Sequence, residues 1–140
     1  MTDIPHLKVR QAMSDEVHQI DAMATVREAM TMMHEHDVGF LVIPRRHETD
    51  ELGLVGVINI ADEVIAKNRS LDRTDVYEVM LKPVLTVDGD MDIRYAVRLL
   101  TRFRLDRAVV VDKNRDLLGI VTMRDLVLAY VYLEEEGIGA

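Results

Sequence analysis

The chain has 140 residues and a mass of 16.0 kDa, with 49% hydrophobic side chains and no cysteine. Its 17 basic and 25 acidic residues give a net charge of −8, which disfavours binding to a nucleic-acid polymer. Without cysteine there is no disulfide, thiolate metal site or cysteine nucleophile, and no apolar run is long enough to cross a bilayer, so we expect a cytoplasmic protein.

The sequence repeats itself at a shift of 67 residues, which aligns Met13 with Met80. After residues 45–53 the shift falls to 63, so that Asp62 aligns with Asp125 and the first copy has about four extra residues. Units of this size usually bury their apolar faces against each other. The predicted organisation is an N-terminal segment 1–8, a first domain 9–69, a second domain 76–133 and a tail 134–140 that we expect to fray.

Each copy predicts the order strand, helix, strand, strand, helix, which is an α/β (α+β) fold of two pseudo-symmetric β-α-β-β-α repeats. In the first copy, Thr25 and Glu28 have the spacing of a capping box at the start of the first helix. The predicted strands of this copy are 17–20, 40–43 and 54–58, a second helix follows from about residue 60, and a polar linker covers 67–76.

The second copy repeats this order. Its predicted strands are 84–87, 108–111 and 117–121, and its helices begin near Asp92 and Met123. The apolar runs FLVI at 40–43 and AVVV at 108–111 are typical of strands that are buried on both faces.

The motif GIVTMRD, residues 119–125, places Thr122 and Asp125 three residues apart at the predicted start of the last helix. Backbone N–H groups at a helix start lack intrahelical partners, and the helix dipole is positive there, so an anion or a sugar hydroxyl is readily bound. An aspartate is also suited to accept hydrogen bonds from a ribose diol. The same spacing equally fits an ordinary capping arrangement that contributes about 1 kcal/mol without any ligand.

The first copy carries GVINIAD, residues 56–62, at the aligned place. Two such units resemble the cystathionine-β-synthase (CBS) domain, which occurs as a tandem pair called a Bateman module. The resemblance covers residues 9–132, nearly the whole chain. The second motif matches the family pattern of glycine, two apolar residues, Thr or Ser, two variable residues and Asp, whereas Asn59 replaces the hydroxyl residue in the first.

This resemblance implies a CBS pair that binds AMP, ADP, ATP or S-adenosylmethionine as a regulatory ligand in a cleft between the two repeats. Asp125 would bind the ribose, Thr122 the phosphate or ribose, and Arg107 the phosphate. The rest of this stronger site would be Ile120, Val38, Gly39, Phe40 and Gln19. A weaker site would use Asp62, Asn59, Val57, Thr86 and Leu105, with Phe40 at the place of Arg107.

We therefore expect a non-catalytic sensor without a metal or catalytic cofactor, because no Ser/His/Asp order, Gly-rich phosphate loop or metal-ligand cluster is present. Such pairs commonly form homodimers, and Tyr130 and Tyr132 are candidate interface residues. The signal would pass to a partner protein that the sequence does not identify. Two alternatives stay open: a ligand-independent dimerisation and interaction scaffold, in which Thr122 and Asp125 are only caps, and an enzyme acting on a nucleotide.

Overall fold

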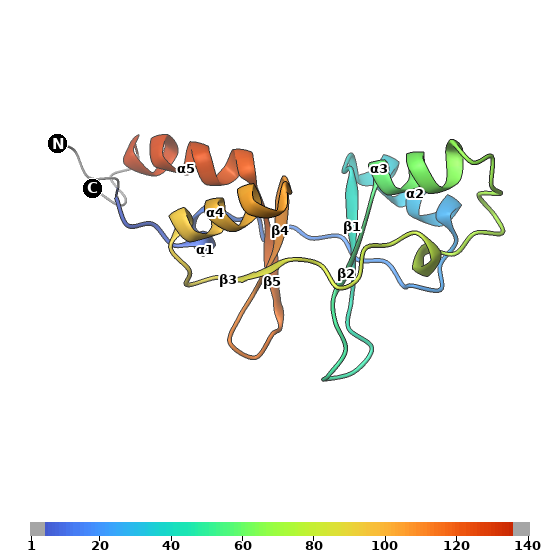
Figure 1. Cartoon of the computed structure of the whole chain (residues 1–140), viewed down its shortest axis with the longest axis horizontal. Coiled ribbons are helices and arrows are strands. Elements are labelled where there is room, and N and C mark those ends of the chain that lie inside the picture. The colour runs from blue at the N-terminus through green and yellow to red at the C-terminus, as the bar shows by residue number, and fades with distance from the viewer. Residues whose placement is uncertain (1–4, 136–140) are drawn as a thin grey trace. The chain divides into compact units, whose positions relative to one another are not determined.

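A computed structural model describes residues 5–135, and it divides into two compact units (Figure 1). One unit is Val17–Val84. The other combines the chain before Val17 with the chain from Leu85 onward. Residues 5–16, called the N-terminal segment from here on, therefore belong to the unit of the second repeat, although residues 9–16 are part of the predicted first domain. The predicted fraying concerns a tail whose residues 136–140 lie outside the described part.

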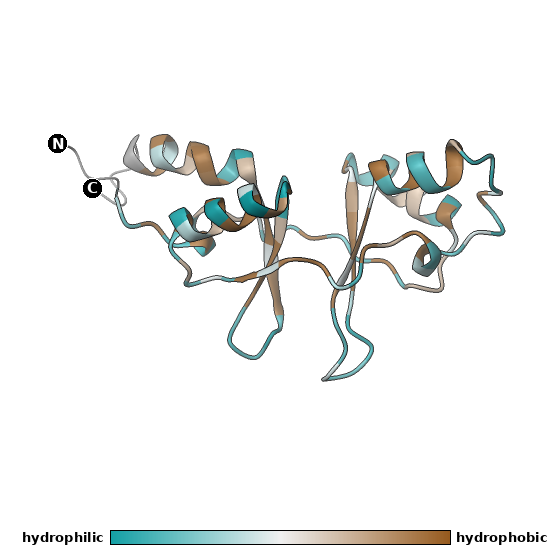
Figure 2. Cartoon of the chain, viewed as in Figure 1, coloured by the Kyte–Doolittle hydropathy of each residue, from teal (hydrophilic) through white to brown (hydrophobic). Residues whose placement is uncertain are grey.

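The unit Val17–Val84 contains a two-stranded antiparallel sheet. Its elements are α2 (Val26–His36), β1 (Phe40–Ile43), β2 (Gly53–Gly56), α3 (Val57–Ile60), the π-helical η1 (Ala61–Ile65) and the 3-10 turn η2 (Val76–Glu78). The predicted strand 17–20 is reduced to a single parallel bridge from Gln19 to Val42. Figure 2 shows hydrophobic residues on both strands, in agreement with the buried FLVI run.

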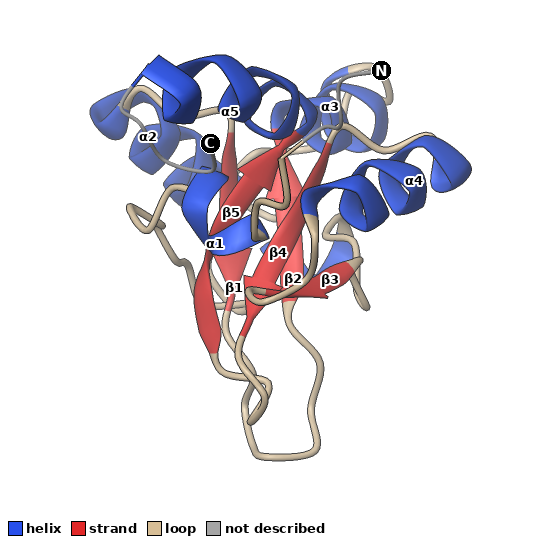
Figure 3. Cartoon of the chain, turned by 90° about the vertical axis from the view of Figure 1, so that its left-hand side faces the viewer, coloured by secondary structure: helices blue, strands red, loops and turns tan. Residues whose placement is uncertain are grey.

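The other unit contains a three-stranded sheet in the order β3-β4-β5, with β3 parallel to β4 and β4 antiparallel to β5 (Figure 3). Its elements are α1 (Val9–Ala12), β3 (Thr86–Asp88), α4 (Ile93–Phe103), β4 (Arg107–Val111), β5 (Leu117–Thr122) and α5 (Met123–Glu135). The core joins Leu7 and Val9 to apolar residues of α4 and α5. The predicted mixed α/β fold is confirmed: this unit has the full β-α-β-β-α order, and in the unit Val17–Val84 the first strand is represented by the single bridge of Gln19.

Side-chain caps set the start of the first helix in each repeat. Thr25 Oγ1 accepts a hydrogen bond from Glu28 N, and Glu28 Oε2 accepts one from Thr25 N, both at 3.1 Å. Asp92 Oδ1 accepts from Arg94 N at 2.8 Å and thereby caps α4. The capping box and the two predicted helix starts are confirmed.

In each unit, backbone hydrogen bonds attach a segment that lies just before the other repeat in the chain. Val9 N donates to Met91 O at 2.9 Å, and Ser14 and Ile120 exchange two backbone hydrogen bonds of 2.9 Å. In the other unit, the linker does the same: Val76 N donates to Ala24 O at 2.8 Å. Because Val9 and Val76 are one repeat apart, α1 and η2 are equivalent elements, and the N-terminal segment does for the second repeat what the linker does for the first.

Asp50, in the loop between β1 and β2, has a side chain that is only 9% exposed. Its carboxylate accepts a hydrogen bond from Arg46 N at 2.9 Å and lies 2.9 Å from Lys82 Nζ. The hydrogen bonds from the Arg46 backbone and from Lys82 hold the pKa of this carboxyl well below its usual range. Asp50 thus holds the loop against Lys82, near the end of this unit.

We expect this carboxylate to contribute to stability at neutral pH and to lose that contribution in acid. Below about pH 4 the unfolded chain takes up a proton that the folded carboxyl does not, so the free energy of unfolding falls as the pH is lowered. Urea unfolding of Asp50→Asn should show a lower midpoint at neutral pH and a shallower loss of stability in acid. Glu48→Gln, exposed in the same loop, is the control. Equal acid dependence in Asp50→Asn and the unmodified chain would contradict this assignment.

Candidate functional site

The junction between β5 and α5 brings Thr122 and Asp125 into direct contact. Thr122 N donates to Asp125 Oδ2 at 3.1 Å, and Asp125 N donates to Thr122 Oγ1 at 3.0 Å. Both residues are half-buried. The capping geometry therefore exists, and it holds the carboxylate in one orientation. Among the described residues, no hydrogen bond is formed to the second carboxylate oxygen, Oδ1, so the cap leaves an acceptor available.

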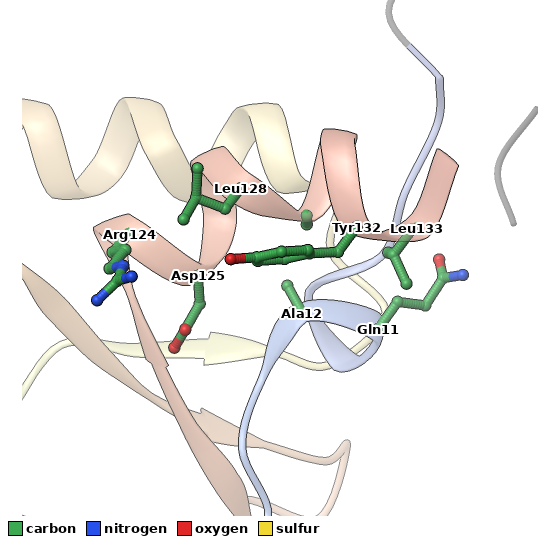
Figure 4. Close-up of a pocket in the computed structure, with 8 residues that line it drawn as sticks. Gln11, Ala12, Arg124, Asp125, Leu128, Tyr132 and Leu133 are labelled. Atoms are coloured by element: carbon green, nitrogen blue, oxygen red, sulfur yellow. The ribbon is translucent and has the colours of Figure 1, made fainter. Parts of the chain in front are cut away.

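A pocket of about 300 Å³ opens between α1 and α5 beside this carboxylate (Figure 4). Asp125 and the exposed Arg124 lie at one end, and the Tyr132 ring extends along the pocket toward them. Its lining consists of Gln11, Ala12, Arg124, Asp125, Leu128, Ala129, Tyr132 and Leu133. The pocket thus combines charged groups at one end with an apolar wall, a combination that is typical of small-molecule sites.

Gln11 and Ala12 are pocket residues that sequence reasoning missed. They lie at the start of the predicted first domain, 9–69, and they reach Asp125 only because α1 packs on β5 and α5. The sequence contains one signal that could have found them: Gln11 lies one repeat before Glu78, in the segment that the repeat aligns with η2.

Arg107 and Ile120 are predicted to form one site with Asp125. Both lie in the same unit as Asp125, but neither lines the pocket. Arg107 pairs with Thr122 across β4 and β5. Its guanidinium Nε lies 3.2 Å from Asp106 Oδ1, and this contact lowers the pKa of Asp106. Ile120 is 2% exposed in the middle of β5. Arg107 is therefore already engaged by a neighbouring carboxylate, and Arg124 rather than Arg107 lines the pocket.

The remaining residues of the stronger site belong to the unit Val17–Val84. Val38 is half-buried after α2, Gly39 is exposed, and Phe40 begins β1. Gln19 is exposed and bridges to Val42. The predicted stronger site is thus divided between the two units. Thr122, Asp125, Arg107 and Ile120 belong to one unit, and Val38, Gly39, Phe40 and Gln19 belong to the other.

Strand pairing determines which residues of the two repeats are equivalent. Val110 pairs with Gly119, and Ile43, which is one 67-residue repeat earlier, pairs with Gly53. The shift at this point is therefore 66, not the predicted 63, and the loop of the first copy is longer by one residue rather than four. The counterpart of GIVTMRD is GLVGVIN at residues 53–59, so Gly56 replaces Thr122 and Asn59 replaces Asp125.

Two hydrogen bonds support this equivalence independently. Asn59 Oδ1 accepts from Gly56 N at 2.8 Å, as Asp125 does from Thr122 N. Val57 N donates to Gly39 O at 2.9 Å, and its counterpart Met123 N donates to Asp106 O at 2.7 Å. The predicted pairing of Asp62 with Asp125 is wrong.

The same register explains two errors in the predicted elements. The strand predicted for 54–58 ends at Gly56, and the helix predicted from residue 60 begins at Val57, one turn earlier. Glycines at both 53 and 56 let the sequence align in either way, and only the hydrogen bonds of the sheet distinguish the two.

The other residues of the predicted weaker site are divided between the two units. Asp62 is exposed within η1, and Val57 is 52% exposed at the start of α3. Thr86 and Leu105 lie in the other unit, where Thr86 is exposed at the start of β3 and Leu105 is 37% exposed after α4.

Comparison with known proteins identifies the repeats. The family model for the CBS domain matches residues 9–62 and 76–132. The chain belongs to the CBS-domain family. Its two CBS domains occur in tandem, and this is a family of regulatory and signalling modules.

Several relatives of this CBS pair differ from it in length. It is 34% identical over 110 residues to an uncharacterized protein of Methanopyrus kandleri, covering 78% of this chain and 55% of that protein. It is 31% identical over 103 residues to an inosine-5'-monophosphate dehydrogenase of Korarchaeum cryptofilum, covering 73% of this chain but 20% of the enzyme. The chain spans about half the length, or less, of these curated relatives.

Solved structures share the fold of the CBS pair. The hexameric CBS-CP12 protein from bloom-forming cyanobacteria has a TM-score of 0.83 and 31% identity, covering 91% of this chain and 73% of that one. The CBS domain of the bacterial CNNM/CorC family Mg²⁺ transporter, in complex with ATP, has a TM-score of 0.74 and 24% identity, covering 89% and 87% of the two chains.

The two tyrosines that are candidate interface residues of the CBS pair differ in exposure. The Tyr130 hydroxyl is buried without a hydrogen-bond partner among the described residues, whereas Tyr132 is 56% exposed. Arg94 is paired with Asp92 at 3.1 Å. Within residues 5–135, no group of three or more side chains could hold a metal ion, and no helix is long and apolar enough to cross a membrane.

Proposed function

We propose that this CBS pair is a non-catalytic regulatory module that binds an adenosine-containing ligand at the junction of Thr122 and Asp125. AMP, ADP, ATP and S-adenosylmethionine are the candidate ligands. The observation that carries the proposal is the Asp125 carboxylate, which is fixed by Thr122 N and lines an open pocket with Arg124 at its side. The ATP complex of the transporter CBS domain is consistent with a ligand of this class.

The proposed chemistry follows from the donor and acceptor groups. An ionised carboxylate has acceptor positions only, so Asp125 is suited to two ribose hydroxyls, of which at least one is bound by the oxygen that the cap does not use. The guanidinium of Arg124 supplies a positive charge for a phosphate or for the carboxylate of S-adenosylmethionine. The ligand changes the signal to a partner protein only as far as it binds one conformation of the CBS pair more tightly than another.

We further propose that the module acts as a homo-oligomer, most simply a homodimer. The hexameric cyanobacterial CBS-CP12 protein shows that a related CBS protein assembles from several chains. In this chain, α5 exposes Val127, Val131 and Tyr132, each more than half exposed. Tyr132 therefore stays a candidate interface residue. The buried hydroxyl of Tyr130 makes that residue a poorer candidate.

Titration calorimetry with AMP, ATP and S-adenosylmethionine tests the proposed ligand class. Asp125→Asn is the informative variant, because Asn59 shows that an amide oxygen maintains the same cap. We expect its affinity to fall at least about tenfold through loss of hydrogen bonds to a charged group, while the free energy of unfolding changes by less than about 0.5 kcal/mol.

Glu28→Gln alters a capping box whose residues do not line the pocket, and it is the control, for which unchanged affinity is expected. The absence of binding by the unmodified chain, or unchanged affinity in Asp125→Asn, would instead favour the ligand-independent scaffold. Turnover of AMP or ATP on long incubation would contradict the non-catalytic assignment.

A further inference from the structure

We infer that this CBS pair carries one adenosyl-ligand site per chain, at Asp125, and that the corresponding junction of the first repeat is not a nucleotide site. This inference rests on the proposed function and concerns the number and identity of its sites. It follows from the register of the two sheets, which makes Gly56 and Asn59, not Asn59 and Asp62, the counterparts of Thr122 and Asp125.

The two junctions have the same backbone hydrogen bonds and different chemistry. Asn59 uses its only side-chain oxygen to cap Gly56 N at 2.8 Å, so the group that remains is an NH₂ donor. Asp125 caps Thr122 N with one oxygen and retains a second, negatively charged acceptor. A ribose diol that donates two hydroxyl protons finds a free carboxylate oxygen at Asp125, whereas at Asn59 it finds only the remaining lone pair of a neutral oxygen that already caps the helix.

The groups around the first junction also differ in a direction that disfavours a phosphate. Ile58, 69% exposed, stands at the position of Arg124, so the cation is missing. Gly56 stands at the position of Thr122, so the hydroxyl is missing. Glu78 stands at the position of Gln11: Asp75 N donates to Glu78 at 2.7 Å, as Lys8 N donates to Gln11 at 2.8 Å. At the position of Gln11, which lines the Asp125 pocket as a neutral amide, the first repeat thus has a carboxylate, although Arg69 also binds it at 2.8 Å.

Asp62 does not compensate for the missing carboxylate. It lies three residues after Asn59, within the π-helical η1, and is exposed. Three residues of helix place it roughly 4.5 Å further along the axis from the strand end. The carboxylate that the sequence motif suggested for the first repeat is therefore one turn away from the position that Asp125 has in the second.

Calorimetric titration of the full chain with AMP and with ATP tests this inference through stoichiometry. We expect one equivalent per chain, affinity within about twofold of the unmodified chain in Asp62→Asn, and at least about tenfold weaker binding in Asp125→Asn. Two equivalents per chain, or a tenfold loss in Asp62→Asn, would overturn the single site and leave the proposed function standing. No binding of either nucleotide by the unmodified chain would overturn both.

Hydrogen exchange gives a second measurement that locates the ligand. AMP or ATP at saturating concentration should slow amide exchange at residues 117–130 and 9–14, the segments that form the Asp125 pocket. Exchange at residues 53–60 should slow less than at these segments in the unmodified chain. Equal or stronger protection at 53–60 would place a nucleotide at the first junction and contradict the inference.

Discussion

Replacement of Leu7 by alanine is expected to lower the free energy of unfolding by about 2–5 kcal/mol, although Leu7 precedes both repeats. Its side chain is 2% exposed and is packed with residues of α4, β4 and α5 in the core of the unit that contains the second repeat, called the second unit below. Its carbonyl also accepts a hydrogen bond from Ile93 N at 2.9 Å. The lost methyl groups would leave a cavity in a core that also contains Val9 and Leu126, both 0% exposed.

Urea unfolding followed by circular dichroism measures this loss, and hydrogen exchange shows where it occurs. Exchange should accelerate in β3, β4 and α4 more than in β1 and α2, because Leu7 belongs to the unit that contains the former elements. Leu81→Ala is the matched control: Leu81 is 48% exposed, and its alanine variant should lose less than about 1 kcal/mol. Equal losses in the two variants would contradict the assignment of the N-terminal segment to the second unit.

Gly119→Ala is the second change with a large expected effect. A Cβ atom at this position would overlap the Ser14 carbonyl oxygen and lie 3.1 Å from Met13 Sδ. The Ser14 carbonyl accepts a hydrogen bond from Ile120 N, and Ser14 N donates one to Ile120 O, so this carbonyl does not move aside without breaking the bridge. We expect a loss of about 1–3 kcal/mol or more, as for other overpacked sites.

The same substitution should also weaken ligand binding. Displacement of Ser14 would shift Gln11 and Ala12, which line the Asp125 pocket, so the affinity for AMP or ATP should fall together with stability. Gly53→Ala is the matched control, because the nearest atoms to its Cβ are Ile43 Cβ and Met80 Sδ at 3.3 Å and the Leu81 carbonyl at 3.4 Å. It should cost less than about 1 kcal/mol. A Gly119→Ala protein with unchanged stability would contradict the close contact between β5 and the N-terminal segment.

Much of each repeat could be predicted from short sequence patterns. The capping box of Thr25 and Glu28, the helix start after Asp92 and the buried strands predicted at 40–43 and 108–111 depend on residues a few positions apart. Local hydrogen bonds and hydrophobic periodicity therefore determine them. The contact of Thr122 with Asp125 is also local, which is why the motif located this part of the candidate site.

The sequence alone thus determined that the chain is a tandem repeat with one complete Thr–Asp junction. Only the tertiary structure decided which segment closes which unit and which residues of the first repeat correspond to that junction. Leu7 and Gln11 join the second unit through contacts that span more than 80 residues of chain, and no local pattern encodes them. The choice between Gly53 and Gly56 as the counterpart of Gly119 was likewise made by hydrogen bonds between strands, because the motif alone favours Gly56, which an aspartate follows six residues later, and only the strand partners identify Gly53.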